Sequence, residues 1–223
     1  MRRLLLLAAA TVLAVLVPAT PAVAITYGVP DGDAHPAVGG LVSPTQYSDG
    51  TWIYCSGTLI SPTVFLTAAH CGETGERVTV TFDTAYQAGD PVYTGTFQAD
   101  PLYTYKQNDP HDIAVVVLDE PVEGITPALL PEAGSLSGLS VGQPFTSVGY
   151  GAYEVTNSPG GHQYLYDDVR QVATGSLWAV NKAWLRISMN PATGDAVCRA
   201  TNVVYRLDTE AARAFLGRYV TLP

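Results

Sequence analysis

Short hydrophobic stretches separated by turn residues run along most of the chain, a pattern typical of β-rich proteins. Between residues 77 and 82 the apolar side chains fall on every second position, which predicts a strand buried on one face. Residues 113–118 are apolar throughout, which indicates a strand covered on both faces. Residues 56–60 and 63–67 favour strands and flank Ser61-Pro62, so they predict a hairpin.

The second half of the chain predicts fewer strands and then a helix. A segment rich in Gly, Pro and Ser, residues 121–142, separates the two halves and indicates a connection. The chain ends in an amphipathic helix over about residues 208–219, for which Asp208 is a suitable N-cap. The predicted strands cover residues 144–150, 169–177, 183–189 and 202–207, and the helix places Ala212, Phe215, Leu216 and Tyr219 on one face.

The N-terminus has the three parts of a secretory signal. Two arginines precede an apolar run over residues 4–17, and Ala22-Val23-Ala24 supplies the small residues of a cleavage site. The apolar run is shorter than the roughly 20 residues that span a bilayer, so we expect export rather than a retained membrane anchor. Cleavage there leaves Ile25 as the first residue. We therefore predict a signal peptide over residues 1–24 and a secreted domain over residues 25–223.

The charge of the chain excludes several classes of partner. The formal net charge is −9, from 11 basic and 20 acidic residues, and the basic residues are scattered. No basic stripe exists that would follow a phosphate backbone or an anionic membrane, so we expect neither nucleic acid nor membrane as a partner. The length suits one β domain or one double barrel, and we expect a monomer.

Two cysteines mark the most informative region. Cys71 ends the segment Thr67-Ala68-Ala69-His70-Cys71, and Cys55 opens the segment Cys55-Ser56-Gly57-Thr58-Leu59-Ile60. Together they resemble the histidine region of trypsin-like serine proteases of the chymotrypsin family. Asp112-Ile113-Ala114-Val115-Val116 resembles the family's aspartate strand, in the right order after the histidine. The resemblance implies an all-β, chymotrypsin-like double barrel, with a first barrel over about residues 37–118, a second over about residues 143–207, and a C-terminal helix.

The same resemblance assigns roles to four residues. His70 would be the general base of a Ser-His-Asp triad, and Asp112 would be the carboxylate that fixes its tautomer. Cys55 and Cys71 would form the family's histidine-loop disulfide, whose short loop is worth about 3 kcal/mol in the chain-entropy model. The implied activity is hydrolysis of peptide bonds in a protein or peptide substrate, without a cofactor.

The nucleophile of this family is missing from the sequence. The family's Gly-Asp-Ser-Gly-Gly-Pro segment has no counterpart. Ser188 has no glycine neighbours, and Ser158 lacks the preceding Gly-Asp, so neither qualifies. Residues 185–190 resemble the strand before that segment, and residues 198–205 resemble a strand well after it, which leaves only residues 191–197 between them. We therefore predict that the nucleophile loop and two strands are deleted, and that the second barrel is truncated and open.

The deletion leaves other groups without their family partners. The cysteine that pairs with the equivalent of Cys198 is absent, so we predict that Cys198 is unpaired. The aspartate that would receive the amino group of Ile25 is also lost, together with the base of the specificity pocket. His35, His111 and His162 show no metal-ligand spacing, so we expect them to be solvated loop residues and expect no metal site.

Three interpretations of the function follow from these features. The chain is a secreted serine endopeptidase family member that a deletion has inactivated, or a non-catalytic homologue that acts as a binding protein, or the product of an error in reading frame or assembly. Covalent labelling of a serine by a phosphonate probe contradicts inactivity. Cooperative thermal unfolding favours the binding protein, and resequencing the codons for residues 191–197 tests the third interpretation.

Overall fold

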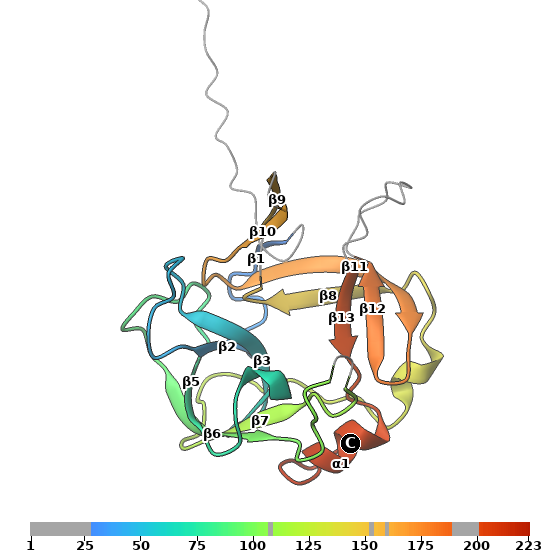
Figure 1. The fold of residues 1–223 in the computed structure, drawn as a ribbon. Coiled ribbons are helices and arrows are strands. Elements are labelled where there is room, and N and C mark those ends of the chain that lie inside the picture. The colour runs from blue at the N-terminus through green and yellow to red at the C-terminus, as the bar shows by residue number, and fades with distance from the viewer. Residues whose placement is uncertain (1–27, 107–108, 152–153, 159–160, 189–200) are drawn as a thin grey trace, which may run out of the picture.

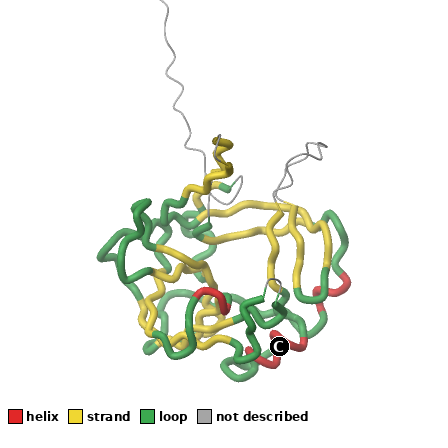
Figure 2. Tube along the Cα trace, viewed as in Figure 1, coloured by secondary structure: helices red, strands yellow, loops and turns green. Residues whose placement is uncertain are grey.

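The computed structural model describes residues 28–106, 109–151, 154–158, 161–188 and 201–223. The predicted signal peptide, Ile25, Cys198 and the shortened segment 191–197 lie outside these residues. Within the described ranges the regular structure is almost all strand, with two short 3-10 helices and one α-helix (Figure 2). No helix in the described part of the chain has both the length and the apolar composition to cross a membrane. The predominance of strands confirms the predicted all-β class.

The first half of the chain forms a closed barrel of six antiparallel strands (Figure 1). Its apolar side chains point inward because side chains alternate between the faces of a strand, and Leu41, Phe65, Val80 and Phe97 are completely buried there. In barrel order the strands are β2 (Val38–Val42), β3 (Ile53–Ser61), β4 (Val64–Thr67), β7 (Ala114–Leu118), β6 (Tyr93–Ala99) and β5 (Arg77–Thr81).

The second half forms an open, curled sheet rather than a closed barrel (Figure 1). Strand β11 pairs with β8 on one edge and with β1 and β12 on the other, and β13 pairs with β12. Ala173, Leu177, Leu185 and Ile187 form its buried core. The strands are β1 (Val29–Pro30), β8 (Pro144–Gly149), β11 (Gln171–Val180), β12 (Trp184–Ser188) and β13 (Thr201–Tyr205).

The open edge lies where the deletion was predicted. Among the described strands, β8 and β13 each pair on one side only, so the sheet does not close between them. Val203 and Val204 are 50 % and 42 % exposed although they point to opposite faces of β13, which shows that both faces are uncovered at this edge. The prediction of a truncated, open second barrel is confirmed.

Strands β1, β2 and β6 were not predicted one by one from the sequence, and neither was a hairpin that follows β8. Residues 154–165 contain an antiparallel hairpin of β9 (Glu154–Ser158) and β10 (Gly161–Leu165), where no strand was predicted from the sequence. The hairpin is a separate two-stranded sheet and stands out from the body of the molecule near β1 (Figure 1). Its two strands pair with each other and not with the large sheet.

The C-terminal helix packs against the first barrel. Helix α1 (Glu210–Leu216) buries Ala212, Phe215 and Leu216 against Val64, Ile113 and Val115 of the barrel. Its N-cap is Thr209, whose side chain accepts a hydrogen bond from the Ala212 N–H, and not Asp208 as the sequence suggested. Asp208 instead binds the buried Arg206 guanidinium at 2.9 and 2.7 Å. A carboxylate with a buried cationic partner is held by that ion pair, so the neighbouring threonine caps the helix.

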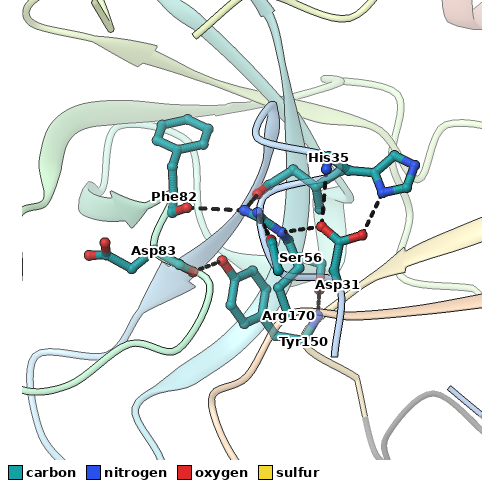
Figure 3. A network of polar contacts seen from close by, with 9 residues as sticks. Asp31, His35, Ser56, Phe82, Asp83, Tyr150 and Arg170 are labelled. Atoms are coloured by element: carbon teal, nitrogen blue, oxygen red, sulfur yellow. Dashed lines mark hydrogen bonds and ion pairs between the residues drawn. The ribbon is translucent and has the colours of Figure 1, made fainter. Parts of the chain in front are cut away.

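A buried arginine joins the two halves. Arg170, immediately before β11, is 1 % exposed, and its Nε donates to Asp31 at 2.9 Å. Its other nitrogens donate to the backbone oxygens of Val38, Phe82 and Gly32, so the guanidinium is bonded to segments on both sides of the junction (Figure 3). A buried charge is tolerable only when it is paired and hydrogen-bonded, and this one is. The network therefore fixes the open sheet against the closed barrel.

Candidate active site

His70 lies on a tight turn that follows a barrel strand. Strand β4 ends at Thr67, and residues Ala69–Cys71 form one turn of 3-10 helix. Ala69 is 1 % exposed and packs in the barrel core, so a larger side chain at that position would displace the turn. The small residues before His70 therefore let the chain leave the barrel and present the imidazole at the surface, where its side chain is 59 % exposed.

Asp112 holds His70 at two points. The ring Nδ1 of His70 lies 2.8 Å from one carboxylate oxygen, and the His70 backbone N–H donates to the other at 3.0 Å. Asp112 stands just before β7, and the next residue, Ile113, is 1 % exposed in the core beneath α1. The apolar strand therefore anchors the carboxylate while leaving it 18 % exposed. The structure brings together the two residues that the sequence had proposed as base and carboxylate.

The pair alters the acidity of both members. The hydrogen bond that His70 donates to Asp112 raises the pKa of His70 above its usual value and outweighs the opposite effect of burial. Burial on its own would raise the pKa of Asp112, but the hydrogen bonds from the His70 ring and backbone outweigh it, so the Asp112 pKa is lowered. The imidazole therefore holds its proton to a higher pH than a free histidine does.

A titration of His70 tests this arrangement. We expect its ring resonances in NMR to titrate with a midpoint above the ordinary value of about 6.5, and to move back toward that value in Asp112→Asn. Because the folded pKa is raised, the stability that protonated His70 contributes is present below the unfolded pKa and is lost as the pH rises through the folded pKa. An unchanged midpoint in Asp112→Asn would contradict the ion pair.

The segment that precedes the histidine is shaped by close packing. Cys55 in β3 and Cys71 at the end of the 3-10 turn are joined by a disulfide, which confirms the predicted pairing. A Cβ atom on Gly57 would lie 2.3 Å from the backbone oxygen of Leu66 and 2.4 Å from the Phe65 ring. Only glycine fits there, so the Cys-Ser-Gly segment reflects how tightly β3 passes β4.

The two aspartates that flank Asp112 in the sequence have other partners, and the two serines considered above lie at the ends of strands. Asp109 accepts hydrogen bonds from Thr104 and from the backbone of His111, and Asp119 pairs with Arg77. Ser188 lies at the end of β12, opposite Ser176 and Thr201 in the neighbouring strands. Ser158 is the last residue of β9. Of these three aspartates, Asp112 is therefore the one that lies beside His70.

The prediction that the remaining histidines are solvated loop residues is wrong for two of them, which are paired with aspartates. His35 Nδ1 lies 2.5 Å from Asp31, the carboxylate that also binds Arg170 (Figure 3). His111 Nδ1 lies 2.8 Å from Asp100. No short-range sequence signal marks these pairs, because turn geometry creates them. His162 belongs to β10, and its side chain lies outside the described residues.

The site offers little to a metal ion. Cys55, His70 and Cys71 bring potential ligand atoms within 4.8 Å of one another. The two sulfur atoms are bonded to each other, however, so neither is a thiolate, which is the form of cysteine that binds metals. Within the described residues, this group therefore presents a single imidazole.

Comparisons with known proteins agree with this geometry. The family model described as Trypsin matches residues 34–198. A solved structure named GrC has a TM-score of 0.58 at 15 % identity, covering 87 % of this chain and 98 % of its own. Neuropsin, a serine protease expressed in the limbic system of mouse brain, has a TM-score of 0.56 at 18 % identity, covering 81 % of this chain and 82 % of its own. No curated protein matches the sequence. The family match spans most of the chain, and the barrel, the disulfide and the histidine turn are those of its fold, so the chain belongs to the trypsin family.

Proposed function

We propose that this chain is a secreted trypsin-family protein that keeps the base and carboxylate of the family's catalytic site but does not cleave peptide bonds through an acyl-enzyme. One observation carries the proposal. Strands β12 and β13 are adjacent in the sheet, and residues 189–200, which connect them, contain no serine. The family's nucleophile, its two following strands and its oxyanion-binding backbone all belong to this connection.

The chemical consequence is larger than the loss of one hydroxyl. A serine attacks only when a histidine accepts its proton, and the tetrahedral oxyanion that forms needs converging backbone N–H donors. Loss of even one such donor lowers the rate on the order of a hundredfold. His70 and Asp112 can still accept and orient a proton, but the deleted segment supplied both the alcohol and the donors.

Export is supported by two features. The N-terminal sequence has the basic, apolar and small-residue parts of a secretory signal. The Cys55–Cys71 disulfide is of the kind that persists in an oxidising compartment. A protein or peptide is the substrate class that the family implies, and we propose that this chain is a monomer without activity toward it.

A serine-directed phosphonate ester tests the proposal. We expect no covalent labelling of the secreted protein and no cleavage of peptide substrates, while an active trypsin treated in parallel is labelled and cleaves. His70→Ala is the matched control, because labelling that depends on an activated serine requires the histidine. Labelling of the parent protein that disappears in His70→Ala would overturn the proposed inactivity.

A second candidate, a non-catalytic binding protein built on the first barrel, is favoured by the completed contacts between the halves. Each guanidinium nitrogen of Arg170 donates a hydrogen bond, and the Tyr150 hydroxyl donates to the Asp83 backbone oxygen, although both residues are buried (Figure 3). We expect such a protein to unfold in one cooperative transition and to leave the dye ANS unbound. Material that aggregates and binds ANS would instead fit a deletion product with no selected role.

A further inference from the structure

Among the residues that the structure describes, the hydrogen bonds of His70 are made by its backbone N–H and its Nδ1, and Nε2 has no partner. Nδ1 is bound to the Asp112 carboxylate, which can only accept a hydrogen bond, so the ring proton lies on Nδ1 and the lone pair of the neutral ring lies on Nε2. The side chain is 59 % exposed. We propose that Nε2 of His70 is itself a nucleophile toward activated acyl esters such as aryl esters. This inference rests on the proposed absence of a serine nucleophile.

The geometry fixes the imidazole before any substrate arrives. One oxygen of Asp112 accepts from the His70 ring and the other from the backbone N–H of the same residue. The adjoining Cys71 is tied by its disulfide to β3, which limits movement of the turn. A ring held in one tautomer and one orientation loses little freedom on attack, so a larger fraction of encounters is productive.

The charge of Asp112 favours the reaction as well as the orientation. The carboxylate is 18 % exposed, and the ion pair it forms within the described residues is with His70. It raises the pKa of the imidazole, and a more basic nitrogen is a stronger nucleophile once it is deprotonated. The same negative charge stabilises the positive acyl-imidazolium that attack produces.

The other described histidines lack this combination. His35 also lies beside a carboxylate, but Asp31 is buried and its charge is balanced by Arg170. His111 is 25 % exposed and lines a small hollow against α1 with Phe215. These two histidines provide an internal comparison. Each is paired to an aspartate through Nδ1, but neither combines an exposed ring with an aspartate that has no other charged partner.

The reaction has two steps. In the first, the Nε2 lone pair attacks the ester carbonyl carbon, the bond from that carbon to the aryl oxygen breaks, and the aryloxide leaves with the electron pair. The product is an acyl-imidazolium whose Nδ1–H remains bonded to Asp112. In the second step, water adds to the acyl carbon and gives up one proton to solvent, the carbon–nitrogen bond breaks, and the neutral imidazole recovers its lone pair. A carboxylic acid is released, and no oxidant, reductant or metal is consumed.

Hydrolysis of 4-nitrophenyl acetate by the secreted protein tests the proposal. We expect release of 4-nitrophenolate faster than from an equal concentration of free imidazole, an acetylated protein on rapid acid quench with the acetyl group on His70, and little change of rate in D2O. His70→Ala loses this excess rate and the acetylation, and Asp112→Asn loses most of it. His35→Gln, which keeps a hydrogen-bonding group beside Asp31, retains both.

Each other outcome counts against the proposal. Equal rates in the parent protein and His70→Ala overturn it, as does acetylation at another residue. A rate that halves or more in D2O without an acetylated intermediate makes His70 a general base toward water and also overturns it. These results leave the proposed function standing, whereas phosphonate labelling of a serine overturns the proposed function itself. Circular dichroism of His70→Ala and Asp112→Asn confirms that both variants are folded.

Discussion

Replacing Arg170 with methionine is expected to destabilise the protein by about 3–5 kcal/mol, the usual cost of removing one partner of a buried ion pair. The methionine fills most of the space but leaves the Asp31 carboxylate, whose side chain is 0 % exposed, without its cationic partner. It also leaves the backbone oxygens of Val38, Phe82 and Gly32 without a donor. Because these groups belong to the contact between the halves, the loss should weaken the attachment of the open sheet to the barrel.

Urea unfolding followed by circular dichroism measures this effect, and the expected loss is a large share of the roughly 5–15 kcal/mol that stabilises a typical domain. Arg186→Met is the matched control, because Arg186 belongs to the same sheet, in β12, but is exposed. We expect its effect to lie within about 0.5 kcal/mol. Similar losses in the two variants would show that Arg170 does not hold the halves together.

Removal of the Cys55–Cys71 disulfide by a double substitution to alanine is expected to cost about 3 kcal/mol, because the bond closes a loop with a sequence separation of 16 and so restricts the unfolded chain. A second effect follows from its place. Cys71 ends the turn that carries His70, so without the bond the imidazole is free to leave Asp112. We expect the midpoint of the His70 titration to fall toward the value of a free histidine.

Thermal unfolding and the histidine NMR titration of the double variant separate these two effects. The control is the single variant Ser56→Ala, which changes the same strand and removes the acceptor of the Tyr150 backbone N–H, but leaves the disulfide in place. It is expected to lower stability by about 1 kcal/mol and to leave the His70 midpoint unchanged. A double variant whose His70 midpoint stays raised would show that Asp112 alone positions the ring.

Several features of the site follow from short stretches of sequence. The Thr-Ala-Ala-His-Cys segment requires small residues to form its tight turn, and the Cys-Ser-Gly segment requires glycine where a Cβ would meet Leu66 and Phe65. The apolar run after Asp112 specifies a buried strand that anchors the carboxylate. Such local requirements are visible in one sequence because a few adjacent residues satisfy them.

Other features depend on distant segments and were missed. Arg170 is separated by 139 residues from Asp31, and nothing around Val169-Arg170-Gln171 indicates which carboxylate lies opposite. Asp208 was expected to cap the helix, but Arg206 binds it and Thr209 caps instead. The choice between neighbouring polar residues depends on which partner is buried beside them, and only the assembled chain determines that.

The sequence by itself determined the family, the histidine turn with its disulfide, the carboxylate strand and the loss of the nucleophile segment, because each is written in contiguous residues or in their absence. Only the tertiary structure decided that Asp112 meets His70 at two points, that three histidines each have an aspartate beside Nδ1, and that β8 and β13 face one another across an unclosed edge. These outcomes depend on packing and pairing between segments far apart in the chain. The free energy of burying a charge or a strand edge depends on which residues of the distant segment lie opposite it.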